Sequence, residues 1–393
     1  MRVAPTPEQQ ALRRELRVYF DQVVTPEDRR RLPHGGTEPD HTRSGPYRRL
    51  VRRLGEDGWL GLGWPVEYGG QGRPLMDQLI FIDEASRAEV PLPLLTIGTV
   101  GPAIMRHGTD EQKAEFLPRI LDGSVDFAIG YSEPEAGTDL ANLSTRASRE
   151  GDDYVINGQK LWTSMVQYVD YVWLAARTDP EAHRHRGLSV LIVPTDTPGF
   201  SFNLIHTVGD QTTGATFYDD VRIPASNRVG PENGGWALMT QQLNRERVAV
   251  SPASKIERAL EETVAWARST RLPTGSRVID QEWVRLDLAR VHAKVEFLKL
   301  INWRIAWGIE HDVAPETASA TKVFGTEFFT EAYRLLLEVV GSSASVVAGS
   351  PGAVLLGRLE RGQRATLILT FGGGTNEVQR DLIAIHGMGM PRG

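Results

Sequence analysis

The sequence predicts an α+β protein of three consecutive domains: an N-terminal helical domain, a central antiparallel β-barrel or sandwich, and a C-terminal helical bundle. Apolar residues recur with helical periodicity through most of residues 5–121. Short segments rich in β-branched and aromatic residues then occupy 125–221, and the helical period returns at Gly234. Because the period changes at these points, we place the domains at 1–124, 125–232 and 233–393.

Composition narrows the class of protein. The 393 residues are enough for two or three packed domains, and 44 Lys and Arg against 50 Asp and Glu leave a net charge of −6. This balance gives no basic field for a nucleic acid or an anionic membrane. There are no cysteines, which excludes disulfides, thiolate metal sites and cysteine nucleophiles. No apolar run spans a bilayer and no signal peptide is recognisable, so we expect a cytoplasmic protein without membrane insertion.

The expected elements follow the chain. In the first domain, Thr6, Pro7 and Gln9 form a helix start signal. In the second domain, His183 and His185 lack the spacing of metal ligands, so we expect no metal site. The helices of this domain are expected at 5–24, 47–57 and 74–121, with a break near Pro91 and Pro93. Strands are expected at 125–131, 154–156, 160–163, 171–176, 188–193 and 215–221. The bundle helices are expected at 235–270, 280–311, 315–340, 351–368 and 375–386.

Asn157-Gly158, between two of the expected strands, predicts a two-residue hairpin turn. A second turn-rich stretch, 131–139, follows a strand that it cannot continue, because Pro134 and Gly137 interrupt strand pairing. Its backbone N–H groups and the hydroxyls of Ser132 and Thr138 suit ligand binding, although a capped turn would use the same residues.

A glycine triplet, Gly372 to Gly374, precedes the last expected helix. Without side chains, its backbone can come close to a flat or charged ligand. Thr375 or Asn376 can cap the helix that follows, which leaves free N–H groups in front of it. A glycine-rich turn before a capped C-terminal helix is the simpler interpretation of this segment.

Several motifs resemble those of the acyl-CoA dehydrogenase family. The stretch 132–139, Ser-Glu-Pro-Glu-Ala-Gly-Thr-Asp, is similar to the family loop (Thr/Ser)-Glu-Pro-x-Ala-Gly-(Ser/Thr)-Asp. Residues 65–72 resemble its Pro-x-Glu-Tyr-Gly-Gly-x-Gly loop, and 108–113 its Gly-(Ser/Thr)-x-x-Gln-Lys pattern. The order of the three domains is also that of the family, so the resemblance covers nearly the whole chain.

The resemblance implies an FAD cofactor whose flavin carries the hydride chemistry. Trp162-Thr163-Ser164 resembles the family's Trp-Ile-Thr, which places an aromatic ring against the isoalloxazine and a hydroxyl near N5. Carried over position by position, the expected cofactor-binding residues are Tyr131, Ser132, Gly137, Thr138, Trp162, Thr163, Ser164, Arg268, Thr375, Asn376 and Glu377.

This sequence lacks a catalytic base at the position where the family most often carries one. The C-terminal signature Tyr-Glu-Gly-Thr-(Ser/Asn)-x-x-x-Arg supplies a Glu in many members, and Gly373 occupies that slot here. In another branch, which includes isovaleryl- and long-chain-type enzymes, the base is the Glu of a Glu-Arg pair that Glu246-Arg247 matches. The resemblance therefore implies that Glu246 is the base, whereas a surface Glu balanced by neighbouring arginines is the alternative.

The implied reaction is α,β-dehydrogenation of an acyl thioester. Glu246 removes the α-proton, and the β-hydrogen leaves as hydride to flavin N5. In relatives, a flavin ribityl hydroxyl and the backbone N–H at the position that matches Gly373 stabilise the enolate oxygen. Arg247, Thr138, Gly373 and Gly374 are the expected substrate-positioning residues.

Two departures point to a subgroup. The Phe-Gly expected after Arg268 is absent, and Glu338 stands where relatives often carry Gln, so the adenine-side contacts differ. This drift resembles actinobacterial enzymes for bulky CoA thioesters such as steroid side chains. We therefore expect a branched or bulky acyl-CoA (or acyl-carrier-protein) substrate, a homotetramer or α2β2 heterotetramer, and an electron-transfer flavoprotein as acceptor. A flavin monooxygenase of the same superfamily and a non-catalytic, flavin-completing subunit are the alternatives.

Overall fold

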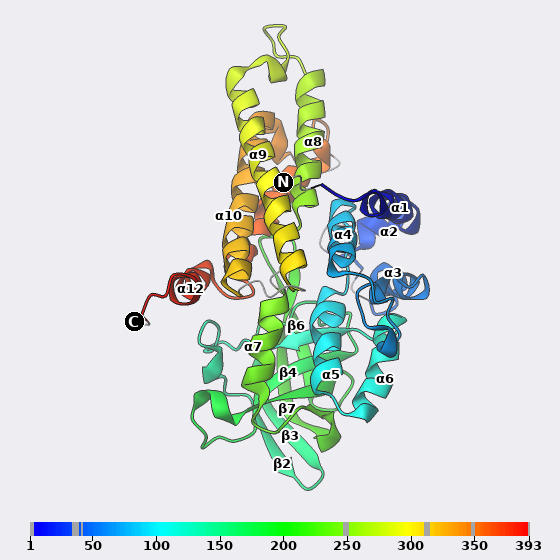
Figure 1. Cartoon of the computed structure of the whole chain (residues 1–393), viewed down its shortest axis with the longest axis vertical. Coiled ribbons are helices and arrows are strands. Elements are labelled where there is room, and N and C mark those ends of the chain that lie inside the picture. Colours follow the sequence, from blue (N-terminus) through cyan, green and yellow to red (C-terminus); the bar gives the residue numbers. More distant parts are fainter. Residues whose placement is uncertain are drawn as a thin grey trace.

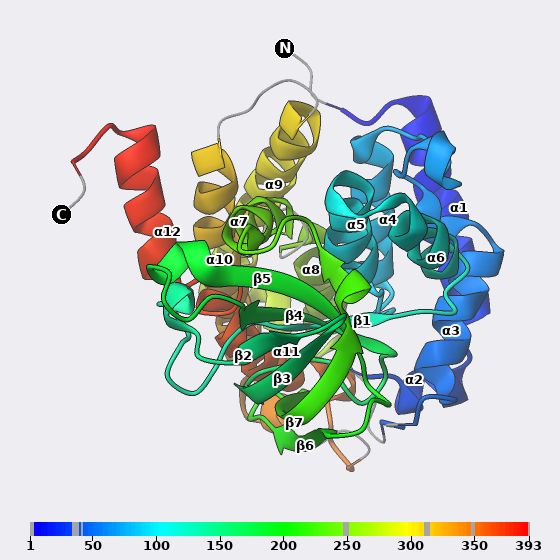
Figure 2. The same cartoon turned by 90° about the horizontal axis from the view of Figure 1, so that it is seen from below.

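The computed structural model describes residues 4–33, 39–40, 42–246, 251–309, 315–346 and 350–391. It has the three parts expected: N-terminal helices, a middle β-sheet domain and a C-terminal helical bundle (Figure 1). Seen from below, the N-terminal helices lie on one side of the sheet and α12 on the other (Figure 2). In the described part of the chain, no helix has the length and apolar character needed to cross a membrane.

The N-terminal helices begin at well-defined caps. Thr6 and Thr109 each form a capping box with a glutamine three residues later, which fixes where α1 and α6 start. The core of this part joins residues of α1, α3, α4 and α6 with one face of the sheet, where Trp173 is fully buried. The helices are α1 (Pro7–Val23), α2 (Pro26–Arg31), α3 (Pro46–Glu56), α4 (Leu75–Arg87), α5 (Gly101–His107) and α6 (Asp110–Leu121).

The middle domain is one eight-stranded sheet with the order β6-β7-β3-β2-β4-β5-β8, and β1 pairs with β4. Most pairs are antiparallel, whereas β1 runs parallel to β4. The apolar run 172–176 in β4 is buried on both faces, because the N-terminal helices cover one face and a second core covers the other. The strands are β1 (Phe127–Gly130), β2 (Arg146–Glu150), β3 (Asp153–Lys160), β4 (Tyr171–Arg177), β5 (Leu188–Pro194), β6 (Phe200–His206), β7 (Thr212–Pro224) and β8 (Arg228–Val229).

The predicted hairpin at Asn157-Gly158 is wrong, because both residues lie inside β3. The two-residue turn lies at 151–152 instead and joins β2 to β3. At Asn157 the pairing of β3 with β7 shifts register, and the Asn157 side chain bonds Asp220 of β7. A Cβ on Gly158 would lie 2.7 Å from Thr145, so this glycine serves a close backbone approach at a bulge.

The C-terminal bundle has its own core, built mainly from α8, α9 and α10. The predicted helix 235–270 is wrong as a single helix, because Ser251 and Pro252 are not helical and Pro252 caps α8. The predicted helix 351–368 is also shorter than expected, since Leu355, Leu356 and Gly357 have positive φ. The helices are α7 (Gly235–Glu246), α8 (Ala253–Ser269), α9 (Glu282–Ile309), α10 (Pro315–Val340), α11 (Arg358–Thr366) and α12 (Asn376–Leu382).

Candidate active site

The loop after β1 and the segment after β3 form one half of the site. The backbone N–H of Leu161 donates to the carbonyl of Ser132 at 2.8 Å, which joins the two segments directly. Tyr131 is buried, and its hydroxyl accepts a hydrogen bond from Trp173 at 3.2 Å. Gly137 and Thr138 are exposed, and no heavy atom lies within 4 Å of the position that a Cβ on Gly137 would take. The loop therefore presents an open backbone and a hydroxyl to solvent.

A buried ion pair holds this loop in place. The ammonium of Lys160, the last residue of β3, lies 2.7 Å from Glu133 and donates to the carbonyl of Tyr131 at 3.1 Å. The Glu133 carboxylate also accepts from both the N–H and the hydroxyl of Ser144 and from the N–H of Thr145. Although burial alone would raise it, the charge of Lys160 and these hydrogen bonds lower the pKa of Glu133 to about 2. Burial lowers the pKa of Lys160 to about 8, so both groups are charged at pH 7.

Trp162, two residues after Lys160, has an exposed side chain. Its φ is +65°, a left-handed conformation that turns its side chain out of the strand direction, and it is 55% exposed. Its neighbour Thr163 is buried and exchanges backbone hydrogen bonds with Gly214 of β7. The Ser164 hydroxyl lies 3.5 Å from that of Thr213. An exposed indole next to a rigid, hydroxyl-bearing strand edge suits a flat heteroaromatic ligand.

The glycine triplet forms a second half of the site on the C-terminal bundle. Gly373 and Gly374 have φ values of +66° and +95°, which explains the glycines there. No heavy atom lies within 4 Å of the position that a Cβ on Gly373 would take. Lys322 of α10 is buried beneath the segment and donates to the carbonyls of Thr370 at 3.2 Å and Gly374 at 2.8 Å.

The helix that follows has a conventional cap and a buried asparagine. The Thr375 hydroxyl accepts from the N–H of Val378, so α12 starts where the sequence predicts. The Asn376 side chain is buried and bonds Lys322 at 2.7 Å, Thr326 and Glu327. We expected Asn376 to contact the cofactor, whereas its side chain packs against α10 of the bundle.

Of the remaining expected residues, Glu377 belongs to the glycine-triplet half, Arg268 lies apart from both halves, and the others cannot be described. Glu377 is exposed on α12, and Arg268 is exposed in the last turn of α8, at the end of the bundle far from the sheet (Figure 1). Glu246 is the last residue of α7, which packs against β5 and α5. Its side chain and Arg247 lie outside the described part of the structure.

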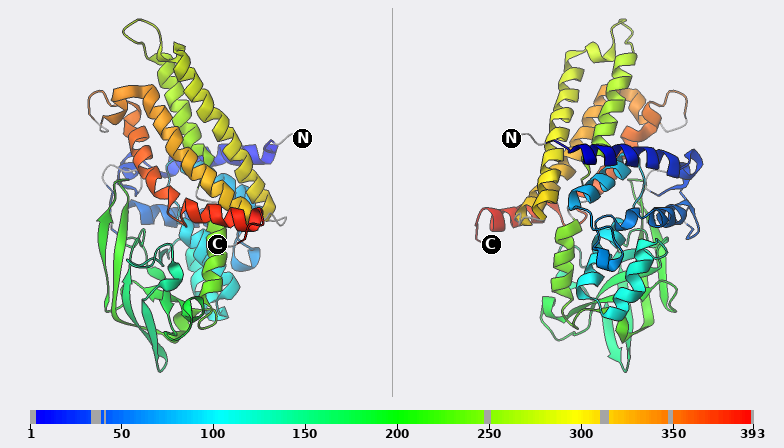
Figure 3. Two further views of the ribbon diagram at one scale, coloured as in Figure 1. Left: turned by 90° about the vertical axis from the view of Figure 1, so that its left-hand side faces the viewer. Right: turned by 45° about the vertical axis from the view of Figure 1, so that its right-hand side comes forward.

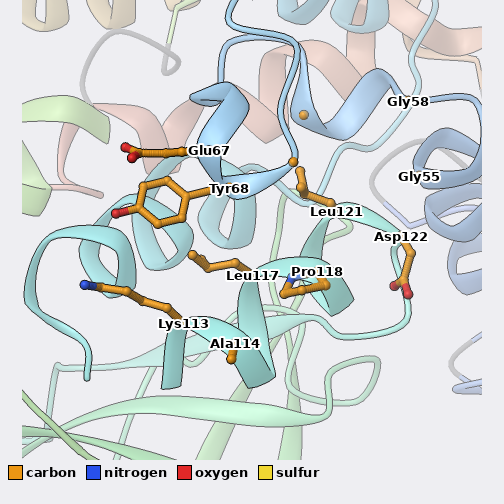
Figure 4. Close-up of a pocket in the computed structure, with 12 residues that line it drawn as sticks. Gly55, Gly58, Glu67, Tyr68, Lys113, Ala114, Leu117, Pro118, Leu121 and Asp122 are labelled. Carbon is orange, nitrogen blue, oxygen red and sulfur yellow. The ribbon is translucent and has the colours of Figure 1, made fainter. Parts of the chain in front are cut away.

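A cavity of about 600 Å³ lies away from all these residues, in the N-terminal domain (Figure 4). It is lined by glycines of the 55–69 segment and by one face of α6, with Tyr68 and Lys113 among its polar groups. None of the expected site residues lines it. Among the described residues, no three His, Asp or Glu side chains converge in a way that could hold a metal ion.

Sequence reasoning missed the two buried lysines and Glu133 as supports of the site. A lysine at the end of an apolar strand is one available signal, because an ammonium buried there requires a partner. Lys322 lies within a long helical pattern whose spacing does not distinguish it from a surface lysine. Only packing reveals its role.

Family comparison agrees with this architecture. The acyl-CoA dehydrogenase N-terminal, middle and C-terminal domain families match residues 6–124, 128–221 and 233–388. Acyl-CoA dehydrogenase FadE26 of Mycobacterium tuberculosis is 58% identical over 399 residues, covering 100% of this chain and 99% of the relative. Acyl-CoA dehydrogenase FadE29 of the same organism is 46% identical and covers 98% of both chains.

Solved structures show the same likeness in three dimensions. A chain of the ChsE4-ChsE5 complex from Mycobacterium tuberculosis superposes with a TM-score of 0.94 at 58% identity, with both chains fully covered. A chain of the Tcur3481-Tcur3483 steroid ACAD gives a TM-score of 0.93 at 47% identity, also over the full length of both chains. The chain belongs to the acyl-CoA dehydrogenase family and is a flavoprotein oxidoreductase of that class.

Proposed function

We propose that the protein binds FAD and dehydrogenates a branched or bulky acyl-CoA thioester, with Glu246 as the base that removes the α-proton. The observation that carries the proposal is the open space at Gly373. The family's commoner base position holds no carboxylate here, and its surroundings leave room for a substrate. Glu246, which ends α7, supplies a carboxylate at the family's other base position.

The β-domain half fits the isoalloxazine of FAD. Trp162 offers an exposed ring, Ser164 and Thr138 offer hydroxyls, and Gly137 leaves open space where a side chain would otherwise stand. When bound, FAD supplies the hydride acceptor for the β-hydrogen. The Lys160–Glu133 pair keeps this surface rigid, since it ties the loop to the strand that carries Trp162. A preorganised surface of this kind lowers the cost of aligning the reacting groups.

The C-terminal half supplies the groups that act on the substrate. An α-hydrogen of a thioester is too weakly acidic for an unaided carboxylate, so the site must stabilise the developing negative charge on oxygen. The N–H of Gly373 serves this role because glycine keeps the donor while leaving space for the acyl chain. Arg247 and Gly374 position the thioester, and Glu246 accepts the proton.

The substrate proposal draws on the relatives. One similar structure is described as a steroid ACAD, and the chain matches it over its full length at 47% identity. We propose a CoA thioester of a steroid side chain as the substrate class, with an electron-transfer flavoprotein as acceptor.

Assembly with a second chain is the final part of the proposal. Two pairs of apolar side chains on α9, Trp283 with Leu286 and Phe297 with Leu300, are 46–61% exposed. Exposed apolar groups of this size favour contact with another chain. Arg268 lies at the far end of the bundle, where it can serve only a neighbouring chain's cofactor. Both similar structures are named for two different proteins, so we propose an α2β2 assembly rather than a homotetramer.

The first experiment is the visible absorbance of the purified protein, quantified as flavin per chain. The protein is expressed alone and together with the other chain of the ChsE4-ChsE5 complex, which stands in for its partner. We expect bound FAD, and bleaching on addition of a steroid side-chain CoA thioester. Absence of flavin in both preparations would overturn the proposal. Flavin only in the co-expressed preparation would support the α2β2 assembly.

The second experiment replaces the proposed base. Glu246→Gln should keep its flavin absorbance and lose nearly all turnover, by about 10³-fold or more, because the amide cannot accept the α-proton. Glu232→Gln, in the loop before α7, is the matched control and should keep normal turnover. Substantial activity in Glu246→Gln would assign the base elsewhere.

A further inference from the structure

A small cavity lies where all three parts of the chain meet. Close to it, α11 approaches the β6–β7 turn (Figure 3), and Arg364 donates to the carbonyl of Val208 there. Its volume is about 100 Å³. The end of α4, the first turns of α8, one face of α11 and the turn 209–211 form its walls, and Tyr333 of α10 closes it. This volume suits an ion rather than a nucleotide or a fatty chain.

The side chains that line the cavity carry an excess of positive charge. The lining cations are Arg87, Lys255, Arg258, Arg358 and Arg361. The lining carboxylates are Glu89, Asp210 and Glu262.

The three lining carboxylates are already engaged. Glu262 binds Arg258 at 2.9 Å and Arg358 at 2.5 Å. Glu89 lies 3.6 Å from Arg358, and Asp210 binds Arg364, which is outside the cavity, at 2.5 Å. A fourth lining group, Arg87, pairs with Glu257 at 3.5 Å and Glu261 at 2.5 Å, both outside the cavity. Of the lining cations, Arg87, Arg258 and Arg358 are therefore neutralised by carboxylates.

Two lining cations have no carboxylate within ion-pair distance anywhere in the described ranges: Lys255 and Arg361. Arg361 donates to the carbonyl of Leu356 at 3.1 Å. Lys255 lies in the first turn of α8, where the positive end of the helix dipole disfavours a cation. Burial lowers the pKa of Lys255, and only the charge of Glu89 opposes this shift. Such a lysine calls for an anion beside it.

Two further residues at or near the cavity are Arg29, which also reflects the positive charge of its lining, and Tyr333. Burial lowers the pKa of Arg29, and so does repulsion from the lining residues Arg258 and Arg358, whereas the charge of Glu89 raises it. Tyr333 is 4% exposed and lines the cavity, and its hydroxyl makes no hydrogen bond with any residue that the structure describes. It is a neutral donor, since burial raises its pKa.

We propose that this cavity binds a tetrahedral oxyanion, phosphate or the phosphate group of a small metabolite, through Lys255, Arg361 and the Tyr333 hydroxyl. Three donors from α8, α11 and α10 surround one small volume, and charge-assisted hydrogen bonds to oxyanions are the strongest that these groups make. The bound anion would tie the N-terminal helices, the bundle and the β6–β7 turn together. Its role is therefore to stabilise the junction of the three domains, separate from the flavin-facing residues.

The test is thermal unfolding of the full-length protein in its native assembly, with inorganic phosphate titrated against chloride at equal ionic strength. Phosphate should raise Tm beyond the chloride control, with saturation. Methyl phosphate, a small organic phosphate monoester, is titrated in parallel to identify the source of the anion. A saturable effect of either compound supports an oxyanion site, and no effect of both beyond that of ionic strength would overturn it.

Variants separate a ligand-binding lysine from a structural one. Lys255→Met should weaken the apparent phosphate affinity at least roughly tenfold, because one charge-assisted contact is lost. Without phosphate this variant should be as stable as the wild type or more stable, since an uncompensated buried charge has been removed. Arg361→Met should weaken phosphate binding in the same way. If Lys255→Met instead unfolded more readily in phosphate-free buffer and kept its phosphate response, the proposal would fail.

Lys299→Met is the matched control. Lys299 belongs to the same bundle and is partly buried, but it pairs with Glu257 and Glu296. This variant should lose some stability and retain the full response to phosphate. An adventitious ion only, bound equally by the wild type and by Lys255→Met, would also contradict the site.

Discussion

Two loops that face the proposed ligand-binding region are each held by a buried lysine, and they are held differently. Lys160 fixes the 131–139 loop of the sheet domain through the Glu133 carboxylate and the carbonyl of Tyr131. Lys322 fixes the glycine triplet of the bundle through two backbone carbonyls and the amide oxygen of Asn376. The first support includes a salt bridge between two buried charges, and the second includes hydrogen bonds to neutral oxygens.

This difference suits the two proposed tasks. A buried ion pair with its hydrogen-bonding groups satisfied gives a rigid surface, as a cofactor platform requires. Hydrogen bonds from Lys322 to backbone carbonyls fix the path of the glycine segment, whose proposed functional group is the backbone N–H of Gly373. We therefore expect the loss of Lys160 to affect flavin binding and the loss of Lys322 to affect turnover.

The largest expected effect is that of Lys160→Met. It leaves Glu133 charged and buried without its counter-ion, which costs about 3–5 kcal/mol of unfolding free energy. The loop should also loosen, so flavin content should fall. Urea unfolding and flavin absorbance measure the two effects, and the double variant Lys160→Met/Glu133→Gln should recover part of the loss. Wild-type stability in the single variant would show that the ion pair is not what fixes the loop.

Acid should weaken the sheet-domain loop through Glu133. Its pKa is lowered in the folded state from 4.5 to about 2, so its stabilisation is complete above pH 4.5 and is lost as the pH falls toward 2. The full shift is worth on the order of 3 kcal/mol. Urea unfolding at a series of acidic pH values should give a shallower pH dependence in Glu133→Gln than in the wild type. Equal slopes would contradict this assignment.

Lys322→Met should cost about 1–3 kcal/mol, because the oxygens of Thr370, Gly374 and Asn376 lose a buried donor. Flavin absorbance should remain near the wild-type value while kcat falls, since the glycine segment no longer has a fixed path. Lys294→Met removes a half-exposed lysine that pairs with Glu331 and should change stability by less than about 1 kcal/mol. If Lys322→Met lost flavin but kept its kcat per bound flavin, the proposal that Lys322 supports turnover rather than flavin binding would be contradicted.

The smallest effect is expected for Gly373→Glu. The space around this position is open, so the cost is that of a non-glycine residue at φ +66°, about 1 kcal/mol. The new carboxylate should not increase turnover, because Glu246 already serves as base, and it should narrow the acyl pocket. Steady-state kinetics with short and bulky acyl-CoA substrates measure both, and a broad gain in activity would contradict the proposal.

The sequence by itself determined the order of helical, sheet and helical domains, the helix starts at Thr6 and Thr375, and the family. These features depend on local chemistry: capping side chains, apolar periodicity and loop motifs that a linear chain displays directly. Local chemistry misled at Asn157-Gly158, where a strong hairpin pair serves a bulge because β7 and Thr145 lie against it.

Only the tertiary structure decided how the site is supported. Glu133 and Lys160 are 27 residues apart, and Lys322 and Gly374 are 52 apart, so no local pattern links them. The inward position of Asn376 and the unneutralised Lys255 likewise depend on helices distant in sequence. Burial and charge pairing are properties of packed surfaces, and a side chain's neighbours across a domain junction are set only when the whole chain has folded.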